Sequence, residues 1–303
     1  MNLIQCNTLN QEQEQAVRAL EQACQAHDGL KGTVFLSNEL NFNPNLNCYY
    51  FLYEDGQAAA FLSLFMPMQK EAEVSAFTLP GLRRKGCFRA LLQQAQAELL
   101  PHGIERFLFV TEPQSAAAAE VLHHYGAKYE YSEYLMSYDR SANPQNRCPK
   151  PPLRLEPASV KVLDDMVELN VLAFHDEEKE ARSLVEKSLQ SPERECWCAY
   201  LEDRMVGVCS INLEEGSISI YGLAIRPQEQ GKGYGRQLLR LLLDRLTARE
   251  NREITLEVSS TNAPAYHLYL TSGFRVKTQF DYSSRPLSEP LDSRGTKGAG
   301  CIL

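Results

Sequence analysis

The sequence predicts an α/β layered fold that is built twice, in tandem, within 303 residues. A chain of this length can hold two compact units, each large enough to bury a core of its own. Both halves place strand-like and helix-like segments in the same order, mixing antiparallel hairpins with helical crossovers. Three landmark pairs also share one offset of 147 residues, namely Pro80 and Pro227, Gly86 and Gly233, and Gly126 and Gly273. A single offset for three landmarks indicates an internal duplication.

In the first half, apolar periodicity predicts a helix over residues 11–27, followed by strands near 48–53 and 58–66. The turn Glu54-Asp55-Gly56 joins these two strands. A strand over 72–79, a helix over 88–100, a strand over 106–111, a helix over 115–125 and a strand near 131–138 complete this half.

In the second half, the same reasoning predicts helices near 160–173 and 179–189 and strands over 196–201, 204–212 and 217–225. A long helix over 234–249 follows, because Leu238, Leu239, Leu242 and Leu246 recur at helical spacing. A strand over 253–258, a helix over 263–271 and a strand over 274–282 close the half. Each half is thus expected to form a mixed, mostly antiparallel sheet flanked by helices.

A polar segment over residues 140–152, with four prolines, reads as a linker between the halves. We therefore expect an N-terminal domain at 1–140 and a C-terminal domain at 153–285. Residues 286–303 are rich in Gly, Pro and Ser and are expected to form a flexible tail.

The composition disfavours several classes of function. The formal net charge of −8 disfavours nucleic-acid binding, since such proteins concentrate positive charge against phosphates. No apolar stretch approaches the ~20 residues that span a bilayer, and no signal-peptide pattern opens the chain, so a cytoplasmic protein without membrane contact is expected. The nine cysteines form no pattern typical of disulfides or of a zinc site, so no metal is expected.

The most informative segment is a glycine-rich turn between the strand 217–225 and the helix 234–249. Its glycines, Gly231, Gly233 and Gly235, are expected to let the backbone turn sharply and bring N–H groups close to a ligand. These donors precede a helix, whose N-terminus attracts anions, and Lys232 and Arg236 add charge. A diphosphate is the natural ligand. The alternative is a tight strand-to-helix loop without a ligand.

The turn is followed by a second motif, and the two together resemble the GNAT superfamily of acyl-CoA N-acyltransferases. Gln230, Gly233 and Gly235 match that family's Q/R-x-x-G-x-G/A turn. A second match, to N-x-x-A-x-x-L-Y-x-x-x-G-F, is formed by Asn262, Ala265, Leu268, Tyr269, Gly273 and Phe274. The resemblance covers residues 153 to about 283 well and residues 1–139 more loosely.

This resemblance implies acetyl-CoA as cosubstrate. The backbone of Leu223, Ala224 and Ile225 would bind the pantetheine arm. The adenosine diphosphate would rest on the turn, together with Asn262; the turn comprises Gln230, Gly231, Lys232, Gly233, Tyr234, Gly235 and Arg236.

Acetyl transfer to an amine requires a base for the ammonium proton and an acid for the leaving thiolate. The resemblance points to Tyr269 as the acid, and Glu257 lies at the position where some protein N-terminal acetyltransferases keep a base. Both also admit structural readings, a core tyrosine and a solvated strand glutamate. No cysteine or serine stands in a recognisable nucleophile setting, so direct attack without a covalent intermediate is expected.

The first half lacks these groups. At the 147-residue offset, Arg83 and Arg84 stand for Gln230 and Gly231, and Phe88 stands for Gly235. Ser115, Val110 and Leu122 replace Asn262, Glu257 and Tyr269. We expect this half to be catalytically silent, either binding CoA without turnover or shaping the acceptor site as a pseudo-partner in an internal pseudo-dimer. Its basic turn reads equally as a CoA contact and as a solvated loop.

The function expected from the sequence is therefore N-acetyl transfer from acetyl-CoA to a primary amine, on a small molecule or a peptide. Two alternatives stay open: a protein N-terminal or lysyl acetyltransferase, and a non-catalytic acyl-CoA-binding regulator.

Overall fold

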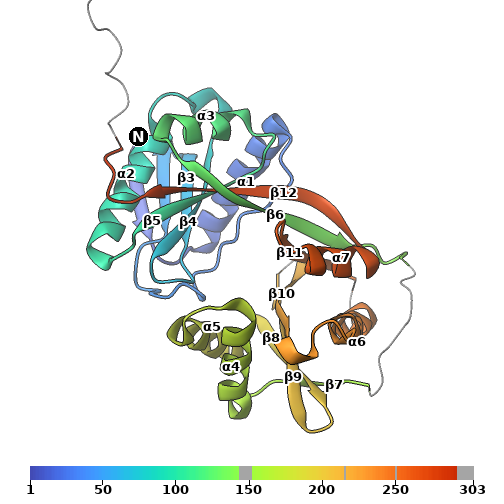
Figure 1. The fold of residues 1–303 in the computed structure, drawn as a ribbon. Helices are drawn as coiled ribbons and strands as arrows, with labels where there is room; N and C mark the ends of the chain where they lie inside the picture. Colours follow the sequence, from blue (N-terminus) through green and yellow to red (C-terminus); the bar gives the residue numbers. More distant parts are fainter. Residues whose placement is uncertain (143–151, 215, 250, 292–303) are drawn as a thin grey trace, which may run out of the picture. The chain divides into compact units, whose positions relative to one another are not determined.

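The computed structural model describes residues 1–142, 152–214, 216–249 and 251–291 (Figure 1). The chain forms two compact units. Unit 1 contains Met1–Ser132 and the C-terminal segment from Gln279, and unit 2 contains Glu133–Thr278. Most of the expected linker, residues 143–151, lies outside the described residues.

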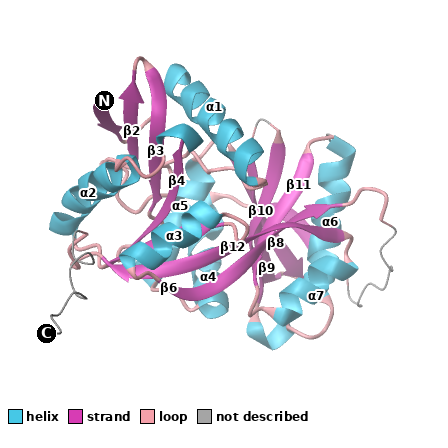
Figure 2. Cartoon of the chain, turned by 90° about the horizontal axis from the view of Figure 1, so that it is seen from above, coloured by secondary structure: helices cyan, strands magenta, loops and turns pink. Residues whose placement is uncertain are grey.

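Unit 1 is a mixed sheet with helices on both faces. Its elements are β1 (Asn2–Cys6), α1 (Gln11–Asp28), β2 (Tyr49–Glu54), β3 (Gln57–Phe65), β4 (Glu71–Thr78), α2 (Cys87–Leu99), β5 (Arg106–Thr111) and α3 (Ala116–Tyr125). Strands β1 to β4 pair antiparallel in chain order, whereas β4 and β5 pair parallel. Figure 2 shows α1 and α2 on opposite sides of β2 to β4.

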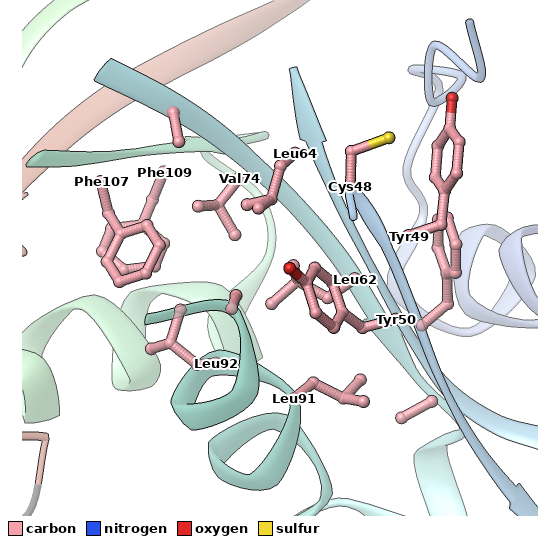
Figure 3. Packing of buried hydrophobic residues seen from close by; sticks show 14 of the residues in the cluster. Cys48, Tyr49, Tyr50, Leu62, Leu64, Val74, Leu91, Leu92, Phe107 and Phe109 are labelled. Carbon is pink, nitrogen blue, oxygen red and sulfur yellow. The ribbon is translucent and has the colours of Figure 1, made fainter. Parts of the chain in front are cut away.

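The first helix has clear local causes. Asn10 and Gln13 form a capping box, in which each side chain accepts a hydrogen bond from the other residue's backbone N–H. Gly29 ends the helix with φ 71°, a left-handed conformation that favours glycine. On the α2 side of the sheet the core is aromatic and aliphatic: Tyr50, Leu62, Leu92 and Phe107 are fully buried (Figure 3).

Unit 2 repeats the plan. Its elements are β7 (Arg154–Pro157), α4 (Leu163–Phe174), α5 (Glu178–Gln190), β8 (Arg194–Leu201), β9 (Arg204–Leu213), β10 (Ser217–Ile225), α6 (Tyr234–Arg249), β11 (Glu253–Ser259) and α7 (Ala263–Thr271). Strands β7 to β10 pair antiparallel in chain order, and β10 and β11 pair parallel.

Strand β8 of unit 2 packs against helices on both faces of the sheet. Along β8, Cys196 and Cys198 pack in the cluster with α4 and α5, whereas Trp197 and Ala199 pack in the cluster with α6 and α7. This alternation is the two-residue period of a strand between two layers of helices. It fixes which side chains of each strand face which layer.

The final strand of each half pairs in the other unit. In unit 1, β5 pairs antiparallel with the end of β12 (Phe274–Pro286), from Asp281↔Thr111 to Pro286↔Arg106 (Figure 1). In unit 2, β11 pairs antiparallel with β6 (Lys128–Tyr138), from Ser259↔Glu133 to Thr255↔Ser137. The two halves of the chain therefore exchange their last strands.

The predicted fold class and tandem plan are confirmed, and element boundaries lie close to those predicted. The short strands β1 and β7 were not predicted. The described part of the expected tail, residues 286–291, is packed instead of flexible: Leu287 and Leu291 are buried, and the Leu287 N–H donates to the carbonyl oxygen of Glu105 at 2.8 Å. The remainder of the tail lies outside the described residues. No helix within the described ranges is long and apolar enough to cross a membrane.

Candidate functional site

In unit 2, two neighbouring parallel strands stop pairing before they end. The ladder between β10 and β11 runs from Ser217↔Glu253 to Ile220↔Leu256 and goes no further. Beyond it, the pairing of β10 with β9 shifts register between Tyr221 and Ala224, and Gly222 has φ 58°. This bulge turns the strand end away from β11.

The expected pantetheine-binding residues form this strand end. Ala224 and Ile225 pair with Val208 and Gly207 of β9, and Leu223 lies between the bulge and this pairing. On the side of β11, residues past Ile220 have left the ladder, so an extended ligand can pair there. Gly222 was missed from the sequence, although a glycine inside a strand pattern is itself a signal for a bulge.

The glycine-rich turn follows β10 through a short 3₁₀ turn, Pro227–Glu229. The Gln230 side chain ties it back to the strand, because Nε2 donates to the Ile225 carbonyl oxygen at 3.0 Å. Gly231 and Gly233 have φ values of 74° and 90°, which favour glycine. Helix α6 then begins at Tyr234, and its first N–H groups lack intrahelical acceptors. The turn therefore presents free backbone donors at the positive end of a helix dipole.

The two cations of the turn have partners within the protein. Lys232 Nζ lies 2.9 Å from Glu229, which also binds Arg204. Hydrogen bonds from these two cations hold the pKa of the buried Glu229 below its usual range. Arg236 Nη2 donates to Thr271 Oγ1 at 3.2 Å. The charge of Lys232 is therefore offset by Glu229, whereas the contact of Arg236 is with a neutral hydroxyl.

Three other expected cofactor residues have structural contacts. Gly235 lies within α6 without a positive φ, so the expectation that it helps the chain to turn is wrong. A Cβ there would make ordinary van der Waals contacts, 3.5 Å from Leu268 Cδ2 and 3.8 Å from Ile225 Cγ1, so the packing around Gly235 does not itself require a glycine. Tyr234 is buried in the core. The Asn262 side chain caps α7 by accepting from the Ala265 N–H at 3.2 Å.

Tyr269, the predicted acid, lies on α7 and is 8% exposed. Its ring packs edge-on against Phe274, with the ring centroids 6.0 Å apart. Burial, with a smaller contribution from Cys209, raises the pKa of Tyr269 to about 12. The hydroxyl makes no hydrogen bond to any side chain or backbone group in the described part of the chain. It is thus a protonated donor at neutral pH.

Glu257, the predicted base, lies on the opposite face of the sheet. Ile254, Leu256 and Val258 of β11 pack in the cluster with α6 and α7, so Glu257 faces the other way. Burial first, and then the charges of Glu133 and Glu214, raise the pKa of Glu257 to about 7. The side chain is nevertheless exposed, so it is surrounded by protein yet reached by water. A carboxyl with a pKa near neutrality suits a general base.

The two predicted reactive groups lie on opposite faces of the sheet of unit 2. Tyr269 belongs to the α7 face, and Glu257, on the other face, directly follows Leu256, the last residue of β11 that pairs with β10.

The first half keeps the backbone of the same turn. Arg83 Nε donates to the Thr78 carbonyl oxygen at 3.1 Å, which repeats the Gln230 contact at the 147-residue offset. Arg84 has φ 62° and Gly86 has φ 86°, close to the values at Gly231 and Gly233. The first half therefore keeps the left-handed backbone of the turn at Arg84, where the second half has a glycine.

A cavity of about 610 Å³ opens beside that turn within unit 1. Its lining includes Thr78, Arg83 and Gly86 from the end of β4 and the turn. Leu122 and Val110, the counterparts of Tyr269 and Glu257, also line it. The basic side chains are engaged: Arg83 forms a two-pronged pair with Asp28, and Arg84 pairs with Glu120. This cavity can accept a ligand but carries no acid or base at the matching positions.

Among the described side chains, no group of His, Cys, Asp or Glu is placed to hold a metal ion.

The chain is similar to known acetyltransferases. The family model described as "Acetyltransferase (GNAT) family" matches residues 14–126 and 163–274. A mycothiol acetyltransferase of Clavibacter michiganensis is 28% identical over 205 residues, which cover 65% of this chain and 66% of that relative, just under two thirds of its length. A [ribosomal protein bS18]-alanine N-acetyltransferase of Salmonella typhimurium is 34% identical over 77 residues, which cover 25% of this chain and 52% of the relative.

Among solved structures, a tandem GNAT protein from the clavulanic acid biosynthesis pathway is similar in fold. The TM-score is 0.71 at 16% identity, over 95% of this chain and 99% of the other. At this identity the likeness concerns the fold alone.

Proposed function

The chain belongs to the GNAT family of acetyltransferases. From this premise we propose that it is an acyltransferase, which transfers acetyl groups from acetyl-CoA to a primary amine at a site in its second half. The observation that carries the proposal is the early end of the β10–β11 ladder at Leu256, with Glu257 next to it on one face of the sheet and Tyr269 in the cluster on the other face. The first half has Leu122 and Val110 at these positions.

The proposed binding mode uses the chain's own backbone. The N–H groups that follow Gly233 hold the diphosphate, because they lack intrahelical acceptors. The strand end at Leu223, Ala224 and Ile225 pairs with the pantetheine amides in place of β11. This pairing directs the thioester towards the end of the β10–β11 ladder.

In the proposed reaction, Glu257 takes a proton from the ammonium of the acceptor. The free amine attacks the thioester carbonyl carbon, so a C–N bond forms and the C–S bond breaks. The sulfur leaves as a thiolate and receives the Tyr269 hydroxyl proton, and the second proton that the amide nitrogen loses restores the Tyr269 hydroxyl. The raised pKa of Tyr269, about 12, keeps that proton in place until the thiolate develops.

We also propose that the first half binds CoA or acyl-CoA without turnover. Two observations support this: the 610 Å³ cavity and the retained backbone of the turn, with Arg84 held at φ 62°. The two sequence copies, 1–140 and 153–285, would then be a ligand-binding domain and a catalytic domain.

The acceptor is proposed as a class, a primary amine on a small molecule or a peptide. The bS18-alanine acetyltransferase relative favours a peptide amine, and the mycothiol acetyltransferase relatives favour a small molecule. Acetyl-CoA offered with a panel of peptides, polyamines, amino acids and aminoglycosides would separate these. If none of these amines accepted an acetyl group although acetyl-CoA still bound, the result would favour a regulatory acyl-CoA-binding protein.

The decisive variant for the mechanism is Tyr269→Phe. The Tyr269 hydroxyl has no hydrogen-bond partner among the described groups, so its removal leaves the fold and CoA affinity nearly unchanged. Losing the acid should lower kcat by about 10²-fold. Steady-state kinetics with calorimetry of acetyl-CoA binding test this, and an unchanged kcat would remove Tyr269 from the mechanism.

A further inference from the structure

We propose that Glu133 is a positioning residue of the transfer site, supplied to the second half by the strand that the first half donates, and that it holds the Glu257 carboxyl and its proton in place. The inference rests on the proposed role of Glu257 as the base. It adds a residue that the duplicated sequence motifs do not contain.

The geometry follows from strand pairing. In the antiparallel ladder of β6 and β11, Leu135 lies opposite Glu257, and Glu133 lies opposite Ser259. Residues two apart on a strand share a face, so Glu133 is the diagonal neighbour of Glu257. Met136 and Tyr134 pack in the cluster with α6 and α7, which puts Glu133 on the opposite face, with Glu257. Long side chains reach each other across such a diagonal.

The two carboxyl groups are hydrogen-bonded to each other. A hydrogen bond between two carboxyls needs a proton on one of them, so this contact favours the protonated form of Glu257. Two adjacent carboxylates repel each other, and ionising both is unfavourable. Glu133 therefore makes Glu257 a stronger base than an isolated glutamate.

Other charged groups around Glu257 act less directly. Glu214, at the turn after β9, adds a weaker negative charge in the same direction. Glu253, on β11 itself, is engaged by Lys277 Nζ at 2.9 Å. On β10, Tyr221 interacts with Arg194, whose guanidinium carbon lies 5.8 Å from the ring centroid. Within the described residues, Glu133 is the neighbour that combines a charge with a hydrogen bond to Glu257.

This arrangement makes the transfer site dependent on both halves of the chain. A fragment of residues 150–303 would lack β6 and with it both Glu133 and the ladder along β11. Loss of activity in that fragment would not show that the first half binds a substrate, so the test must use the full chain.

The experiment compares the full-length chain with Glu133→Gln, Glu133→Asp and a control, Glu130→Gln. Glu130 lies on the same strand but pairs with Arg106, at 2.8 Å, and not with Glu257. The titration midpoint of Glu257 is followed by carbon NMR of glutamate-labelled protein, with its signal assigned through Glu257→Gln. In parallel, kcat/KM for acetyl-CoA and a peptide with a free N-terminal alanine is measured against pH.

In Glu133→Gln, the Glu257 midpoint should fall by about one pH unit, because a like charge is removed. The acidic limb of kcat/KM should move with it. Glu133→Asp should restore part of the shift, and Glu130→Gln should match the wild type. A merely structural role for Glu133 would lower the rate without moving either curve.

Two results would overturn the inference in distinguishable ways. An unmoved midpoint in Glu133→Gln, while Glu257→Gln still abolishes the acidic limb, would reject Glu133 and leave the proposed base intact. A midpoint that falls while the kinetic limb stays in place would reject the positioning role together with the assignment of Glu257 as the base.

Discussion

Replacing Gly233 by alanine tests whether the backbone of the glycine-rich turn binds the diphosphate of acetyl-CoA. Gly233 has φ 90°, well beyond the left-handed well near ~57° that alanine can enter. Holding an L-residue there costs about 2 kcal/mol. The first half has a glycine at the same position, Gly86 with φ 86°, whereas it tolerates Arg84 at φ 62°. Both halves thus have glycine at the position of Gly233, whereas only the second half has glycine at the position of Gly231, so the requirement for glycine is stricter at Gly233.

The strain should appear in ligand binding. Alanine relieves it by rotating φ towards the left-handed well, and this rotation tilts the N–H groups that point at the diphosphate. If all of the ~2 kcal/mol is lost from binding, acetyl-CoA affinity falls about 30-fold. Calorimetric titration of the full chain with acetyl-CoA measures the affinity. Thermal unfolding measures the part of the strain that lowers the free energy of unfolding instead.

Gly103→Ala is the matched control. Gly103 has φ 76°, no atom within 4 Å of the point that an added Cβ would occupy, and no place in the turn. The Gly103→Ala variant should lose about 2 kcal/mol of folding stability, from the same kind of strain, and its affinity for acetyl-CoA should not change. If Gly233→Ala bound acetyl-CoA as tightly as Gly103→Ala does, the glycine turn would not be the diphosphate site.

Two further substitutions probe the base and the strand end. Glu257→Gln should flatten the rise of kcat/KM with pH, and it should also gain stability at alkaline pH. A carboxyl whose folded pKa is raised from 4.5 to about 7 contributes stability below pH 4.5 and loses it as pH rises through 7. Solvent exposure reduces the upper bound of about 3 kcal/mol to about 1 kcal/mol. Denaturant unfolding at pH 5 and pH 8 measures this gain, and an equal difference from the wild type at both pH values would contradict the raised pKa. Gly207→Ala should lose about 1–3 kcal/mol, because its Cβ would lie 2.7 Å from Ile225 Cδ1 and 3.0 Å from the Ala224 carbonyl oxygen. Gly216→Ala, with open space around it, should be near neutral, and equal losses in both variants would refute the steric explanation.

Much of the fold could be predicted because the relevant signals are local. Apolar periodicity and turn residues placed α6 at Tyr234–Arg249 and α7 at Ala263–Thr271, as found. The turn at Gln230 was predictable for the same reason, since glycines with positive φ and a helix start are contiguous in the chain.

The strand exchange could not be predicted, because alternation identifies a strand but not its partner. Glu133 was missed for that reason: 124 residues separate it from Glu257 in the sequence, and only the β6–β11 ladder brings the two together. The charge partners of the turn were equally hidden. From the sequence, Lys232 was expected to add charge to the ligand site, and Arg83 was read equally as a CoA contact and as part of a solvated loop. In the fold, Glu229 and Asp28 engage these two side chains.

The exchanged strands also constrain how the protein is made. During synthesis, β5 emerges long before residues 281–286, its partner in unit 1. Until then this edge offers unpaired N–H and C=O groups, which other chains can join. The edge of unit 1 at β5 therefore stays unpaired during synthesis until residues 281–286 have emerged and paired with it.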